Sequence, residues 1–237
     1  MKEIPLIILH GWDLNSDRFS PLVKALRQKN YLVFCPNLPG FGKMPKPMKS
    51  LYLKDYIQFV LKFMADNKFK KAIFICHSFG GRIGIKLAAL YPNKIHKLIL
   101  TGAPGLLPVP QVKVIFFHYL AKIGKLVFSL PGLNLLQNLA QKVIYRMAGA
   151  SDYYNTDQRM RETFQNVVKE NISQYLPLIN AETLLLWGKN DSFVAPGIAI
   201  KMSKIISKNK LSIIDNIGHG FPYTNPKMFV NHLEEFL

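Results

Sequence analysis

Short apolar runs alternate along the chain with longer stretches in which apolar residues recur at helical spacing. Runs that are apolar at every position, rather than at alternate positions, are typical of strands covered on both faces of a parallel sheet. The pattern predicts strands at residues 4–9, 31–35, 72–76, 97–100, 183–187 and 211–214. Between them it predicts helices at residues 20–29, 51–67, 80–91, 196–207 and 225–237.

The alternation of strands and helices fails between residues 104 and 180. This stretch opens with Pro104, Pro108 and Pro110 and then carries apolar residues at helical spacing without a strand pattern. We therefore predict an α/β fold with a doubly wound, mostly parallel sheet of about six strands and an inserted helical cap. The core comprises residues 1–103 and 181–237, and the cap comprises residues 104–180.

A serine follows the third predicted strand in the segment Cys76-His77-Ser78-Phe79-Gly80-Gly81. A strand, a sharp turn and a helix form the context that a nucleophile elbow requires, in which the serine hydroxyl projects above the sheet. Residues two positions from the serine must be small. Gly80 meets this need, whereas Cys76 stands where the usual G-x-S-x-G pattern has glycine. We predict that Ser78 is a nucleophile; a serine that merely caps a helix is the alternative.

Two further polar residues follow predicted strands in the order that such chemistry requires. A serine hydroxyl needs an imidazole to take its proton, and the imidazole needs a carboxylate to fix its tautomer. Asp191 follows the strand at 183–187 and His219 follows the strand at 211–214. We therefore expect Asp191 and His219 to complete a triad with Ser78; Asp215 is an alternative acid.

A tetrahedral intermediate also needs preorganised N–H donors for its oxyanion. The amide of Phe79, directly after the candidate nucleophile, is expected to supply one donor. The amide of Trp12, in the loop that follows the first strand, is expected to supply the second. His10 and His77 are expected to be structural groups rather than catalytic bases.

These motifs together resemble the α/β-hydrolase superfamily, in its cap-bearing, esterase-like branch, over almost the full chain. His10-Gly11-Trp12 resembles the family's H-G-x oxyanion loop, and residues 37–42 are similar to its D-x-P-G-x-G loop, with Asn37 at the usual Asp position. Residues 77–81 resemble the H-S-x-G-G elbow, and residues 187–191 match the W-G-x-x-D acid loop. The resemblance implies that the first two strands of the full family sheet are missing here.

The resemblance also implies a function. We expect a serine hydrolase that cleaves small-molecule carboxylic esters of small to medium apolar acyl groups. Lactonase, thioesterase and carbon–carbon bond hydrolase activities use the same triad and stay open, as does a non-catalytic protein that binds a ligand or a membrane. An Asp nucleophile, as in dehalogenases and epoxide hydrolases, is absent. Cap residues expected to line the substrate pocket are Phe116, Phe117, Tyr119, Met147 and Tyr153.

Composition adds expectations about partners and compartment. The chain has 31 Lys and Arg against 14 Asp and Glu, a net charge of +17, which favours weak association with anionic membranes. A lysine-rich proteome, in which the charge has no function, is the simpler explanation. The lysines are scattered and not interleaved with aromatic residues, so we expect no nucleic-acid binding. The absence of metal-binding motifs predicts no metal or other cofactor, and two cysteines without a signal peptide predict a soluble cytoplasmic protein.

Overall fold

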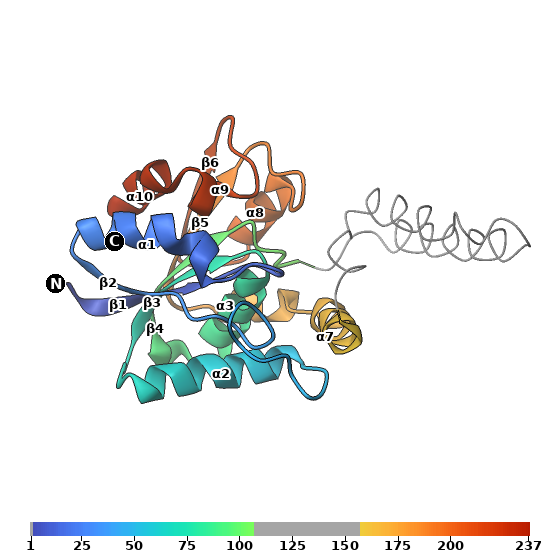
Figure 1. The fold of residues 1–237 in the computed structure, drawn as a ribbon. Helices are drawn as coiled ribbons and strands as arrows, with labels where there is room; N and C mark the ends of the chain where they lie inside the picture. Colours follow the sequence, from blue (N-terminus) through green and yellow to red (C-terminus); the bar gives the residue numbers. More distant parts are fainter. Residues whose placement is uncertain (1, 107–156) are drawn as a thin grey trace, which may run out of the picture.

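The computed structural model describes residues 2–106 and 157–237. In this part of the chain the strands form one parallel sheet in the order β2-β1-β3-β4-β5-β6, which confirms the predicted fold (Figure 1). The strands are β1 (Lys2–Leu9), β2 (Tyr31–Phe34), β3 (Ala72–His77), β4 (Ile95–Thr101), β5 (Glu182–Gly188) and β6 (Asn209–Ile214).

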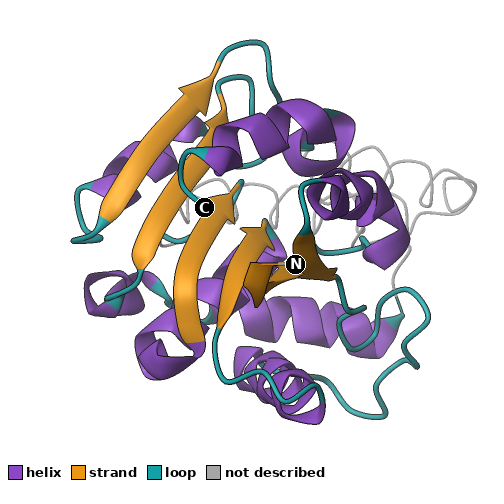
Figure 2. Cartoon of the chain, turned by 90° about the vertical axis from the view of Figure 1, so that its left-hand side faces the viewer, coloured by secondary structure: helices purple, strands orange, loops and turns teal. Residues whose placement is uncertain are grey.

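Helices cover both faces of the sheet (Figure 2). The α-helices are α1 (Ser20–Gln28), α2 (Leu53–Asp66), α3 (Phe79–Leu90), α7 (Gln158–Lys169), α8 (Pro196–Ser203), α9 (Phe221–Thr224) and α10 (Pro226–Glu234). Short 3-10 helices are η1 (Ser16–Phe19), η2 (Pro92–Lys94) and η3 (Ser173–Leu178). Helices α1, α9 and α10 pack on one face, whereas α2, α3 and α8 pack on the other.

Successive residues of the central strands enter the two cores alternately, as the period of a strand requires. Ile7 and Leu9 of β1 pack under α2 and α3, while Leu6 and Ile8 pack under α1 and α10. All four side chains are fully buried. Burial of such a side chain contributes about 1.5–3 kcal/mol, so the two-sided sheet explains why these runs are apolar at every position.

The observed helices agree with the predicted ones to within a few residues, except at the end of α8. The pattern predicted a helix to residue 207, but α8 ends at Ser203. The side-chain amide of Asn209 donates hydrogen bonds to the carbonyls of Ser203 (2.8 Å) and Ile206 (2.6 Å). These contacts satisfy carbonyls that a continuing helix would use itself, and the chain turns into β6 instead.

Both cysteines are free thiols. Cys76 lies within β3 and is fully buried, and Cys35 follows β2 in a half-buried position. Burial raises the pKa of the Cys35 thiol to about 12 and that of Cys76 still higher. Both thiols therefore stay protonated at neutral pH and have little nucleophilic character.

Candidate active site

Ser78 occupies the sharp turn between β3 and α3. Its backbone has φ 52° and ψ −114°, in the region of positive φ that non-glycine residues rarely adopt. The Ser78 amide donates to the Thr101 carbonyl of β4 (3.0 Å), and the Ser78 carbonyl accepts from the Gly81 amide (2.9 Å). Strain of this kind persists only where the surroundings fix the backbone, and it is common at functional sites.

Close packing around the turn requires glycine at two positions. A Cβ atom on Gly80 would lie 2.1 Å from the carbonyl oxygen of Leu9, and one on Gly81 would lie 2.2 Å from the Cβ of Ala103. Neither contact is sterically possible. The start of α3 is thus pressed against β1 and the loop after β4, which fixes Ser78 at the end of the sheet.

The structure accounts for cysteine at the usual glycine position of the motif. The Cys76 side chain points toward α3, where Gly84 leaves room for it. A Cβ atom on Gly84 would lie 2.5 Å from the Cys76 Sγ and 3.1 Å from its Cβ. Cys76 therefore fits beneath the turn because the helix carries a glycine one turn further on.

Asp191 and His219 form a direct pair. Asp191 follows β5 and is 5% exposed; its Oδ2 lies 2.8 Å from Nδ1 of His219, which follows β6. Its other oxygen, Oδ1, accepts hydrogen bonds from the amides of Phe193 (2.9 Å) and Val194 (2.8 Å). Since the carboxylate can only accept a hydrogen bond, the neutral imidazole carries its proton on Nδ1. Its Nε2 is then able to accept a proton from another group.

The turn after β4 brings this pair close to Ser78. Gly102 has φ 57°, and a Cβ atom there would lie 2.7 Å from Nδ1 of His219. The preceding residue, Thr101, holds the Ser78 amide through its carbonyl. The His77 ring, next to Ser78, lies 4.8 Å from the His219 ring between centroids. Serine, imidazole and carboxylate therefore gather around one turn at the carboxyl end of the sheet.

Trp12 and Phe79 lie on the two segments that meet at this turn. The loop after β1 contacts the elbow directly, because the His10 carbonyl accepts from the Gly80 amide (3.1 Å). The side chains of Trp12 and Phe79 pack edge to face with centroids 5.2 Å apart. The two residues predicted to donate amides to an oxyanion are therefore in contact with each other beside Ser78.

The buried His10 holds two loops together. Its Nε2 accepts from the Leu38 amide (2.9 Å), and its Nδ1 therefore donates to the Gly11 carbonyl (2.8 Å). Burial lowers the pKa of His10 to about 4, with the bond to Gly11 acting in the opposite direction. The neutral ring fixes the loop after β2 against the loop that carries Trp12.

His77 is also fully buried. Neither of its ring nitrogens has a hydrogen-bond partner in the part of the chain that the structure describes. Burial holds the pKa of His77 well below its usual value, and the nearby His219 adds to this, although the Thr101 carbonyl opposes it. The ring is therefore neutral at physiological pH, and it contacts the rings of Phe19 and Tyr223 as well as that of His219.

Comparison with known proteins identifies the family to which this architecture belongs. The family described as alpha/beta hydrolase fold matches residues 4–226. The chain belongs to the α/β-hydrolase family. It is 25% identical to "Putative esterase/lipase 2" of Mycoplasma pneumoniae, covering 100% of this chain and 90% of that protein. It is 24% identical to 2-hydroxy-6-oxononadienedioate/2-hydroxy-6-oxononatrienedioate hydrolase 1 of Pseudomonas putida, covering 96% and 83%. Among solved structures, an esterase from Exiguobacterium antarcticum superposes with a TM-score of 0.76 at 19% identity, covering 98% and 91%.

Asp215, the alternative acid, lies on the surface of this α/β-hydrolase. Its side chain is 71% exposed and pairs with Lys189, Nζ to Oδ1 2.7 Å. Asp191, by contrast, is the carboxylate that contacts His219. Among the described residues, no cluster of His, Cys, Asp or Glu is arranged to bind a metal ion. The described helices include none that is both long and apolar enough to span a membrane.

The predicted pocket residues Phe116, Phe117, Tyr119, Met147 and Tyr153 lie outside the described residues. The described part instead shows aromatic side chains that the sequence did not single out. Phe164 of α7 packs on Trp12 with centroids 5.0 Å apart, and Phe193, 71% exposed, lies 5.1 Å from the His219 ring. An aromatic residue two positions after the predicted acid was a signal for Phe193; Phe164 had none.

Arg82 is a third residue that sequence reasoning missed. It lies on α3, is 5% exposed, and donates to the carbonyls of Pro104 (3.2 Å) and Val167 (2.8 Å), and also to that of Glu170. Burial lowers the pKa of Arg82 to about 10, which leaves it charged at neutral pH. The helix that begins at the elbow is thus tied to the loop after β4 and to the end of α7. An arginine on the apolar face of a predicted helix was the available signal.

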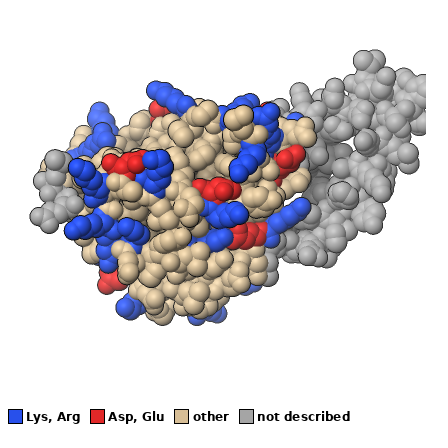
Figure 3. All heavy atoms as spheres, turned by 90° about the horizontal axis from the view of Figure 1, so that it is seen from below, with Lys and Arg blue, Asp and Glu red and all other residues tan. Residues whose placement is uncertain are grey.

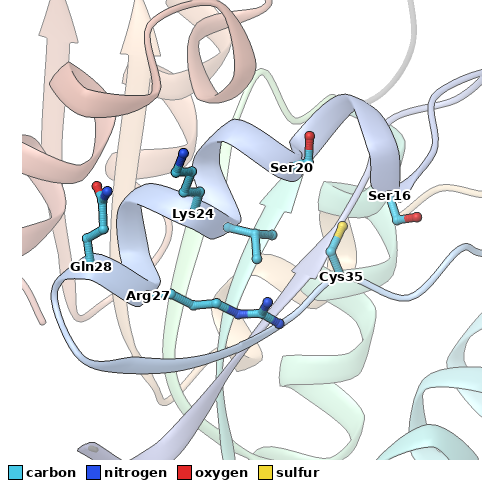
Figure 4. A pocket seen from close by; sticks show the side chains of 7 residues that line it. Ser16, Ser20, Lys24, Arg27, Gln28 and Cys35 are labelled. Carbon is cyan, nitrogen blue, oxygen red and sulfur yellow. The ribbon is translucent and has the colours of Figure 1, made fainter.

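A groove of about 560 Å³ lies elsewhere, along α1 near the edge strand β2 (Figure 4). The side chains that line it are Ser16, Ser20, Val23, Lys24, Arg27, Gln28 and Cys35. Arg27 donates to the Val33 carbonyl of β2 (3.0 Å) and so covers part of that edge. The groove includes none of the candidate catalytic residues.

Proposed function

We propose that this α/β-hydrolase is a serine esterase that cleaves carboxylic esters of small to medium apolar acyl groups through an acyl-enzyme intermediate. The observation that carries the proposal is the Asp191–His219 pair beside a serine held at positive φ. A binding protein has no physical need for a buried carboxylate that fixes the tautomer of an imidazole at this position.

In the first half-reaction, Ser78 Oγ attacks the ester carbonyl carbon while its proton passes to Nε2 of His219. Asp191 keeps the other proton on Nδ1 and stabilises the imidazolium. The amides of Trp12 and Phe79 hydrogen-bond to the negatively charged oxygen of the tetrahedral intermediate. The intermediate collapses as the alcohol leaves with the proton from His219, and the acyl group stays on Ser78.

In the second half-reaction, water takes the place of the alcohol. His219 accepts a proton from the water as its oxygen attacks the acyl carbon. The second tetrahedral intermediate expels Ser78, which recovers the proton, and releases the carboxylic acid. The neutral His10 and His77 take no part in these transfers, since burial holds their pKa values low.

Two observations support an ester as the substrate. A protein with esterase/lipase in its name matches the whole chain, and the described rings around the site, those of Trp12, Phe79 and Phe164, suit an apolar acyl group. The similar protein of Pseudomonas putida has a name that points to carbon–carbon bond cleavage. The same triad serves that reaction, lactone hydrolysis and thioester hydrolysis, so the test includes them.

The test compares wild type with Ser78→Ala on p-nitrophenyl butyrate, a lactone, an acyl thioester and a vinylogous 1,5-diketone. Ser207→Ala, at an exposed serine in the turn after α8, is the matched control. We expect fastest turnover of the butyrate ester, loss of about 10³-fold or more in Ser78→Ala, and no change in Ser207→Ala. Retention of most activity by Ser78→Ala would refute the nucleophile, and a faster turnover of another substrate would refute the ester.

A further inference from the structure

A strongly basic segment with exposed apolar side chains follows β2 and runs into the first residues of α2. We call residues 43–54 the basic segment; its lysines are all exposed, at Lys43, Lys46, Lys49 and Lys54. No acidic residue occurs between residues 37 and 54. Met48 is 93% exposed and Tyr52 is 50% exposed. The described structure thus exposes two large apolar side chains within a run of lysines.

The residues of the basic segment favour an irregular loop without acidic partners for its lysines. Pro45 and Pro47 have no amide N–H, so neither can donate the hydrogen bond that a central strand or the interior of a helix requires. The nearest acidic residue in sequence, Asp55, accepts the Tyr52 amide (2.7 Å) at the start of α2. Its carboxylate is therefore engaged at the end of the helix, and Lys54 lies over the Tyr52 ring at 5.7 Å instead.

Both ends of the basic segment are anchored beside the candidate active site. On one side, Phe41 is buried and packs edge to face on Trp12, with centroids 4.9 Å apart. On the other side, the Leu51 amide donates to Oγ1 of Thr163 (2.9 Å), and the Leu51 carbonyl accepts from Asn166 (3.3 Å). The segment thus lies next to α7, at the end of the molecule where the strands end (Figure 1).

We propose that the basic segment docks this protein on the surface of an anionic phospholipid bilayer. The lysines contact the phosphate-bearing headgroups, and Met48 and Tyr52 enter the boundary between headgroups and acyl chains. On the neighbouring face that carries α2, basic side chains are more frequent than the acidic ones interspersed among them (Figure 3). An RNA partner would account for the lysines but not for a methionine at the exposed tip.

Docking is independent of the proposed ester hydrolysis, because none of its residues belongs to the site. It has a geometric consequence: the contacts from Phe41 to Trp12 and from Leu51 to α7 place the bilayer near the side of the molecule that carries Ser78. Apolar molecules dissolved in the bilayer would then reach that side without crossing bulk water.

Co-sedimentation with vesicles tests the proposal. The protein carries Ser78→Ala so that hydrolysis cannot alter the lipid, and the vesicles contain phosphatidylcholine with or without phosphatidylglycerol. We expect binding that requires phosphatidylglycerol and weakens with salt. Replacing Lys43, Lys46 and Lys49 by Gln should weaken it at least about tenfold, since each cation near an anionic surface changes partitioning several-fold. Met48→Ser should weaken it by a further factor of about two or more.

Two matched variants distinguish the contribution of the basic segment to binding from the effects of net charge and of exposed apolar side chains in general. The first replaces the exposed Lys68, Lys70 and Lys71, between α2 and β3, by Gln and removes the same charge. The second, Met228→Ser, removes a methionine that is 43% exposed on α10. Each control variant should bind phosphatidylglycerol vesicles much more tightly than the corresponding variant of the basic segment. Equal loss in the two lysine variants, absence of binding to phosphatidylglycerol vesicles, or binding to polyuridine RNA alone would overturn the proposal.

Discussion

The loops after β5 and β6 each carry an aspartate, but the two residues have opposite environments. Asp191 has a side chain that is 1% exposed, with one oxygen on two backbone amides and the other on His219. The Asp215 side chain is 71% exposed and pairs with Lys189. An exposed pair of this kind is screened by water and salt, whereas a buried carboxylate with fixed donors orients its partner. Burial against backbone donors is thus what distinguishes the carboxylate that we propose as the catalytic acid from the one on the surface.

Substitution of the buried aspartate should have the largest effect on activity. In Asp191→Asn the side-chain amide would donate to His219, which shifts the imidazole proton to Nε2 and leaves no acceptor for the Ser78 proton. We expect kcat on p-nitrophenyl butyrate to fall by about 10³- to 10⁴-fold. Asp215→Asn is the matched control and should keep kcat near wild type. A greater loss in Asp215→Asn than in Asp191→Asn would show that the assignment of the acid is wrong.

A second prediction extends the comparison to a buried imidazole. The pKa of His10 is about 4 in the folded protein against an ordinary 6.5, so between pH 6.5 and 4 the unfolded chain binds more protons. The free energy of unfolding therefore falls with acidification through this window, and His10 accounts for about 3 kcal/mol of the fall. His10→Gln keeps an acceptor for the Leu38 amide. Urea unfolding at several pH values should show that the free energy of unfolding of this variant depends less steeply on pH than that of wild type. Parallel pH profiles for the two proteins would contradict this account.

Substituting a buried and an exposed glycine by alanine should have smaller and different effects on the free energy of unfolding. Gly84→Ala places a methyl group against Cys76 and should lower the free energy of unfolding by about 1–3 kcal/mol. Adding Cys76→Ala removes the Sγ and should restore part of the loss, which a double-mutant cycle measures. Gly197→Ala, on α8 with nothing within 4 Å of the new methyl group, should be neutral or slightly stabilising. Additive effects of Gly84→Ala and Cys76→Ala would contradict the proposed fit.

The sheet and the elbow were predictable because their signals are local. Strands buried on both faces must be apolar throughout, and a sharp turn from strand to helix demands small residues at fixed offsets from Ser78. The same reasoning placed Asp191 and His219 at the end of the sheet where Ser78 lies, since the carboxyl ends of parallel strands meet at one edge. Local pattern was thus sufficient for the sheet and for the edge of the sheet at which Ser78, Asp191 and His219 lie.

Contacts between distant segments were not predictable. Gly84 compensates for Cys76 only because α3 lies against β3, and Gly102 has no room for a side chain because His219 comes from a loop more than a hundred residues later. The carbonyl partners of Arg82 likewise come from elsewhere in the chain. The early end of α8 depends on Asn209, a residue of the following strand. In each case the deciding atom lies on another element, which a periodic pattern does not encode.

The most direct test of the central claim is covalent labelling of Ser78. A fluorophosphonate ester should react with the native protein as Ser78 Oγ attacks phosphorus, fluoride leaves, and His219 takes the proton. Intact mass and peptide mapping should show one adduct, on the peptide that contains Ser78. The adduct should be absent in Ser78→Ala and form much more slowly in His219→Gln. A folded wild-type protein without an adduct, or with an adduct on another residue, would contradict the account.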